Sequence, residues 1–195
     1  AEPVFVVQAE AGVIGSNLAG RQPDTPTFRE WGMAGTSHAD THLVGSAGDT
    51  IDCDVPINDG PMHLVAKAAL RSLDTWVRTG DAPPSAELIE TTDGDAIAIV
   101  RDDDGIAVGG IRTPSVDVPA AVLSGEPGPS SDLICLLMGS TSPMPPEVLA
   151  ERYASVEDYE AQYEASADEA IAAGFVLEED REALLGYARP ELVGG

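Results

Sequence analysis

The sequence predicts an α/β fold in which two parallel strands and a helix are followed by a second, mixed segment. Two short apolar runs, at residues 4–7 and 27–34, predict the strands. Glu10 follows the first run and His38 follows the second. Because the carboxyl ends of parallel strands open onto one edge of a sheet, these two side chains are expected to lie close together.

The first strand is predicted from Val-Phe-Val-Val at residues 4–7, a continuous apolar run. Such a run is typical of a parallel strand that is buried on both faces. The helix that follows the second strand is expected to open at residues 58–61, with Asn58 or Asp59 as its cap. Gly80 is expected to end it.

A pair of prolines at residues 83 and 84 divides the chain. We therefore expect a core segment at residues 1–82 that carries Glu10 and His38. Residues 83–195 are expected to form an extension that packs on this core.

The extension is expected to hold a β-hairpin and two helices. Residues 95–101 and 106–111, separated by Asp-Asp-Asp-Gly, predict the hairpin. A Ser-x-x-Asp capping box at residues 155–158 predicts a helix that ends near Gly174, and a further helix is expected over residues 178–188.

The composition excludes two classes of partner. The 195 residues include 34 acidic and ten basic side chains, for a net charge of −24. Nucleic acids and anionic membrane surfaces would repel such a chain. No apolar run reaches the roughly 20 residues that span a bilayer, and no signal peptide is recognisable, so the sequence leaves the localisation open.

The cysteines do not indicate a metal site. Cys53 and Cys135 are the only two, and they form no Cys-x-x-Cys pair, so neither a zinc site nor a thioredoxin-type motif is expected. The sequence leaves open whether they form a disulfide. It gives no reason to expect a cofactor.

Glu10 and His38 match the needs of a Ser-His-acid triad. In such a triad the carboxylate orients the imidazole, which takes a proton from the serine. A Gly-x-Ser-x-Gly nucleophile elbow is absent from the 195 residues. We therefore expect the C-terminal part of a serine hydrolase that is inactive in isolation. The alternative is that Glu10 is a solvated loop acid and His38 a turn histidine.

Other polar groups offer alternative sites. Ser37 lies in an elbow-like segment, but loop residues rather than a helix follow it. His38, Asp40 and His42 would face one way on an extended strand and could hold a divalent cation in a metal-dependent hydrolase. Arg112 follows two glycines and could bind a substrate carboxylate or clamp a loop.

Several motifs together resemble a family of α/β-hydrolase domain proteins over nearly the whole chain. They are Arg-Gln-Pro-Asp at 21–24, Gly-Thr-Ser-His-Ala-Asp at 35–40, Pro-Ile-Asn-Asp-Gly-Pro at 56–61 and Gly-Gly-Ile-Arg-Thr-Pro at 109–114. The resemblance implies the last two parallel strands and final helix of an α/β-hydrolase sheet, with an appended hairpin and helical tail.

The resemblance also implies functional roles. His38 would be the triad base and Glu10 the acid, acting on an ester or related acyl bond of a small-molecule substrate. Relatives often carry an Asp just after this glutamate, where the present chain has Ala11 and Gly12. The nucleophile and oxyanion hole would come from upstream sequence or a partner chain. The alternative is a non-catalytic binding or assembly module, in which a partner covers the strand edge at residues 4–7.

Overall fold

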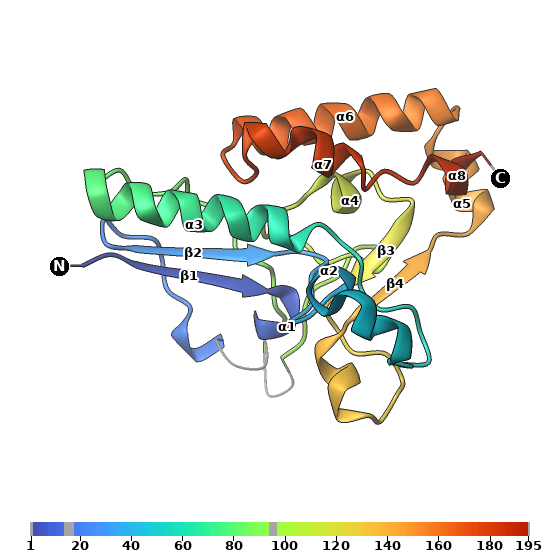
Figure 1. The fold of residues 1–195 in the computed structure, drawn as a ribbon, viewed down its shortest axis with the longest axis horizontal. Helices are drawn as coiled ribbons and strands as arrows, with labels where there is room; N and C mark the ends of the chain where they lie inside the picture. Colours follow the sequence, from blue (N-terminus) through green and yellow to red (C-terminus); the bar gives the residue numbers. More distant parts are fainter. Residues whose placement is uncertain (1, 14–17, 94–96, 195) are drawn as a thin grey trace.

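The computed structural model describes residues 2–13, 18–93 and 97–194 (Figure 1). Strands β1 (Val4–Ala9) and β2 (Phe28–Met33) pair in parallel, with Val4 opposite Phe28 and Ala9 opposite Met33. The predicted parallel pairing is therefore confirmed. The register brings the ends of both strands to the same edge, where Glu10 begins the short helix α1 (Glu10–Gly12).

Helix α3 (Met62–Thr79) lies along the strand pair, and the C-terminal helices lie on its other side (Figure 1). Trp31 is fully buried at the centre of this core and meets the ring edges of Phe5 and Phe175. Apolar side chains from α3 and from residues 167–184 belong to the same cluster. The segments before and after the two prolines thus share a core.

Strand β1 is less buried than the sequence predicts. Val4 is 53% exposed and Val7 is 38% exposed, so the prediction of burial on both faces is wrong. The physical reason is that, within the described residues, β1 pairs only with β2. An apolar run therefore indicated a strand correctly but overstated its burial.

The ends of α3 follow the sequence only in part. Gly80 ends the helix with a left-handed backbone (φ 85°), as predicted. The expected side-chain cap is wrong, because Pro61 occupies the N-cap position and no side chain bonds there. The Asn58 amide instead donates to the carbonyls of Gly35 and Ser124, so it joins loops rather than capping a helix.

The expected hairpin is present only as a turn with short bridges. Gly105 supplies the left-handed residue (φ 85°), and Arg101 bridges Ala107 in antiparallel fashion. No regular strand forms among described residues 97–111. The backbone N–H of Val108 donates to the carbonyl of Val100, and Glu90 exchanges one backbone hydrogen bond with each of these two residues. Residues 95 and 96 of the expected hairpin lie outside the described residues.

In the C-terminal half, the Ser155 hydroxyl accepts from the backbone N–H of Asp158, so the predicted cap of α6 is confirmed. The predicted continuous helix over residues 178–188 is wrong: a 3₁₀ turn precedes a short α-helix that ends before Gly186.

The remaining elements are η2 (Leu18–Gly20), α2 (Thr41–Val44), η3 (Gly45–Thr50), α4 (Pro114–Asp117), β3 (Ala121–Ser124), η4 (Leu133–Leu137), β4 (Ser140–Pro143), α5 (Pro146–Arg152), α6 (Val156–Ala172), η5 (Glu178–Asp180), α7 (Arg181–Leu185) and α8 (Pro190–Val193).

Cys53 and Cys135 form a disulfide across 82 residues of sequence, which answers the question that the sequence leaves open. It ties η4 to the loop that follows η3, over a small cluster with Ala39 and Met138. Across the part of the chain that the structure describes, no helix has the length and apolarity to cross a bilayer.

Candidate functional site

His38 is an exposed residue on an otherwise buried loop. From residue 31 to residue 40, at the end of β2 and in the turn that follows, His38 alone is exposed to solvent. Its neighbours Ser37 and Ala39 are 0% and 9% exposed. The fold therefore presents one imidazole to solvent at the carboxyl end of a parallel strand.

Hydrogen bonds fix this loop on both sides of His38. The Thr36 hydroxyl donates to the carbonyl of Met33 (2.7 Å) and accepts from the backbone N–H of Glu10 (3.2 Å). The backbone N–H of Ala39 donates to the carbonyl of Leu137 (2.9 Å). The backbone that carries the imidazole is therefore restrained by these hydrogen bonds.

The Glu10 carboxylate lies beneath the loop and is fully buried. One oxygen accepts from the backbone N–H of Gly35 (2.7 Å). The other accepts from the Arg101 guanidinium (2.6 Å) and from the backbone N–H of Gly125 (3.1 Å). The structure thus places Glu10 at the junction of three segments, rather than in a solvated loop.

Glu10 and His38 lie on neighbouring turns, but no hydrogen bond joins them among the described residues. The ring of His38 lies close to Gly12: a Cβ atom built there would be 3.5 Å from its Cε1 atom. Glu10 instead contacts the loop of His38 through the backbone N–H of Gly35 and the side-chain hydroxyl of Thr36. Glu10 therefore supports the loop that carries His38.

Arg101 is a site residue that the sequence analysis missed. Its guanidinium bonds Glu10, and it also bonds the carbonyl of Gly105 (3.0 Å). Burial lowers the pKa of Arg101, but the neighbouring carboxylates of Glu10 and Glu126 outweigh this and raise it. Arg101 lies 91 residues from Glu10, so no local sequence pattern could have indicated the pair.

The alternative nucleophile and metal site are not favoured by the geometry. The Ser37 hydroxyl is buried and donates to the carbonyl of Ala39 (2.6 Å). Asp40 caps α2 by accepting from the backbone N–H of Leu43 (2.8 Å), so residues 38–42 do not form the extended strand on which the three candidate ligands would face one way. Among the described residues, no three His, Cys, Asp or Glu side chains gather as metal ligands would.

His42 stacks instead on His63, with the ring centroids 3.5 Å apart, and the ring of Tyr187 lies 6.0 Å from that of His63. Burial lowers the pKa of His63, and the positive charge of His42 lowers it further. Asp40 and Asp180 act in the opposite direction, whereas Lys67 adds to the lowering. His63 therefore resists protonation in the folded protein.

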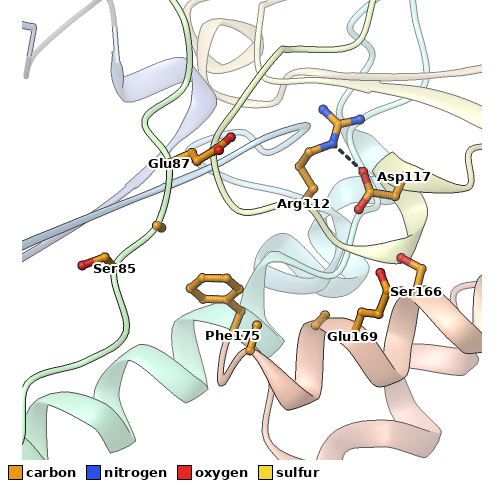
Figure 2. A pocket seen from close by; sticks show the side chains of 11 residues that line it. Ser85, Glu87, Arg112, Asp117, Ser166, Glu169 and Phe175 are labelled. Carbon is orange, nitrogen blue, oxygen red and sulfur yellow. Dashed lines mark hydrogen bonds and ion pairs between the residues drawn. The ribbon is translucent and has the colours of Figure 1, made fainter.

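Arg112 lines a cleft of about 310 Å³ between α6 and residues 85–87, shown in Figure 2. Its guanidinium is already committed, because it bonds Asp117 and the carbonyls of Ala107 (2.6 Å) and Val116 (3.2 Å). Of the two predicted roles for Arg112, these bonds favour the loop clamp. The cleft is also lined by Glu87 and Glu169, which would disfavour a substrate carboxylate.

Glu10, which follows β1, precedes His38, which follows β2, and in an α/β-hydrolase the acid likewise precedes the histidine along the chain. A model of the alpha/beta hydrolase domain family matches residues 1–186, and the chain belongs to this family. A search of curated proteins and a search of solved structures each find no match. Family membership indicates a hydrolase-type function.

The ion pair between Arg101 and Glu10 is expected to be a major source of stability. In Arg101→Met the buried carboxylate loses its cation, which should lower the free energy of unfolding by about 3–5 kcal/mol. Arg78→Met is the matched control, since Arg78 pairs with Asp74 at the surface, where both side chains are more than half exposed. It should cost at most about 0.5 kcal/mol. Urea unfolding measures both, and equal losses would contradict the assignment.

The lowered pKa of His63 predicts how the free energy of unfolding depends on pH. Because the pKa of His63 is lowered in the fold, the unfolded chain binds a proton more readily below about pH 6.5. The contribution of His63 to stability is therefore present above that pH and lost as the pH falls. In His63→Phe the free energy of unfolding should decline less between about pH 7.5 and 5.5. Tyr187→Phe changes the same cluster without removing a group that titrates there, and should keep the original slope.

Proposed function

We propose that this chain is the part of a serine hydrolase that carries the general base, and that the enzyme cleaves an ester or related acyl bond. His38 is the base in this proposal. The nucleophilic serine comes from upstream sequence or from a partner chain, because residues 1–195 contain no nucleophile elbow. The observation that carries the proposal is the single exposed imidazole on a buried, hydrogen-bonded loop after β2.

His38 would act twice in each turnover. It takes the proton of the attacking serine and later returns it to the leaving group, so that a covalent acyl-enzyme forms and is then hydrolysed. Such a base must stay oriented between the two transfers. The bonds of Thr36 and Ala39 supply this restraint at the backbone on either side of the ring.

Glu10 is the acidic member of the site in this proposal, and it acts as a positioning residue. Its carboxylate holds the backbone N–H of Gly35, and its own N–H holds Thr36, so both contacts bear on the loop that carries His38. Arg101 in turn holds the carboxylate. This arrangement replaces the direct acid-to-imidazole bond of a complete triad with support through the backbone.

A binding or assembly module is the second candidate function. The exposed Val4 and Val7 on β1 favour it, because an open apolar strand is a surface that another strand could cover. A binding or assembly module would give His38 no role, although burial and hydrogen bonds restrain the whole loop around it. A partner that covers β1 is also compatible with the hydrolase proposal, in which the partner supplies the serine.

The base is tested in the protein as isolated from its source, with any chain that co-purifies. His38→Ala should lower kcat/KM for p-nitrophenyl butyrate by about 10⁴-fold or more. His42→Asn is the control from the same segment and should retain activity. A fluorophosphonate probe should label a serine outside residues 1–195. Ester hydrolysis by residues 1–195 alone that survives His38→Ala, or labelling of Ser37, would contradict the proposal.

The support by Glu10 is tested by adding a carboxylate beside the ring. Gly12 lies in the helical turn α1, and a side chain there would meet the His38 ring at ordinary contact distance. Gly12→Asp should raise kcat by about tenfold or more, because a carboxylate bonded directly to the imidazole is worth up to roughly 10⁴-fold in complete triads. Gly12→Asn, which adds the same volume without charge, should give no gain. An unchanged kcat in Gly12→Asp would contradict the proposal that His38 lacks a directly bonded carboxylate.

A further inference from the structure

Helix η4 places a group of large apolar side chains in water. Leu133 is 80% exposed, and Ile134, Leu136 and Leu137 are each more than 40% exposed. Exposed apolar residues that cluster in this way commonly mark a binding surface. Cys135, at the centre of the same helix, is fully buried. We call the four exposed side chains the η4 face.

The disulfide keeps the η4 face pointing outward. Cys135 is bonded to Cys53, and together they pack in a small cluster with Ala39 and Met138. A short 3₁₀ helix with a leucine-rich sequence would otherwise be free to turn its apolar side chains inward. The covalent bond instead anchors the one residue of η4 that faces the interior.

The η4 face lies next to the proposed base. The carbonyl of Leu137 accepts from the backbone N–H of Ala39, the residue that follows His38. The carbonyl of Met138 accepts from Asn58, whose side chain holds Gly35 at the start of the same loop. In Figure 1 the gold segment that contains η4 lies next to η3 and the loop that follows it, to which the disulfide ties it. The apolar surface therefore begins one residue away from the exposed imidazole.

The charges around η4 indicate which apolar ligand would bind. Asp132 is the single charged residue between residues 128 and 141, in a chain with a net charge of −24. All ten lysine and arginine side chains, each within the described residues, already pair with a carboxylate. An anionic headgroup or fatty-acid carboxylate would find no unpaired cation here. A neutral hydrocarbon chain would meet the four apolar side chains of the η4 face.

We propose that the η4 face binds the apolar acyl or alkyl chain of a neutral ester whose reacting carbonyl lies at His38. This inference rests on the proposed function, because it assigns the substrate class of the same site. The disulfide between Cys53 and Cys135 holds the binding surface in place. The enzyme should therefore prefer esters with long, uncharged chains.

The test is a binding experiment that needs no catalysis. Nile red, a neutral apolar dye, is titrated into the chain of 195 residues and then displaced with 1-decanol or 1-butanol. We expect 1-decanol to displace the dye at much lower concentration than 1-butanol. Leu133→Ser/Leu136→Ser should bind both the dye and 1-decanol about tenfold more weakly, because two apolar contacts are lost.

The matched control is Leu70→Ser/Val77→Ser, which removes two side chains of similar exposure, 70% and 64%, from α3. This variant should bind the dye normally. Cys53→Ser/Cys135→Ser should bind it more weakly than the unaltered chain, even when circular dichroism shows unchanged helix content. His38→Ala should leave dye binding unaffected, so the loss of the proposed hydrolase function would be distinguished from the loss of this surface.

Three outcomes would overturn the inference. Equal weakening in the η4 and α3 variants would make the dye a general probe of apolar surface. Unchanged binding in Leu133→Ser/Leu136→Ser would place the ligand elsewhere. Self-association that Leu133→Ser/Leu136→Ser abolishes, without 1-decanol displacement, would assign the η4 face to a second copy of the chain.

Discussion

The site depends on the ion pair and hydrogen bonds that hold the buried carboxylate of Glu10. An ionised carboxylate is costly to bury unless charges and hydrogen bonds replace its water. Here the replacements come from Arg101, Gly35 and Gly125, which are far apart in the chain. Satisfying this one group therefore fixes the end of β1 against three other segments. Gly125 must lack a side chain, since a Cβ atom there would lie 2.3 Å from the carbonyl oxygen of Thr36.

The same junction explains why His38 is exposed yet restrained. The loop after β2 is held from below by Glu10 and from the side by η4, so its backbone bonds are satisfied without the imidazole. The ring is then free to face a reacting group. In the proposed enzyme, a base on such a restrained loop would lose little entropy when a substrate arrives.

The sequence predicted what local patterns control and missed what long-range contacts control. The strands, their parallel pairing, the cap at Ser155 and the end of α3 at Gly80 follow from apolar runs and turn residues. The positions of Glu10 and His38 at one sheet edge followed from the same reasoning. Arg101 could not be found this way, because any of 34 acidic residues could have been its partner. The exposure of β1 was also hidden, since burial depends on neighbours rather than on the run itself.

The distribution of charge over the protein determines which substrates can approach its surface. Ten cations serve 34 carboxylates, and each cation forms an internal ion pair, from the buried Arg101 to the exposed Arg78. The cations therefore act as structural ties between segments, and the carboxylates left over give the surface a strong negative potential. An anionic substrate would be repelled on approach, whereas a neutral ester would be unaffected.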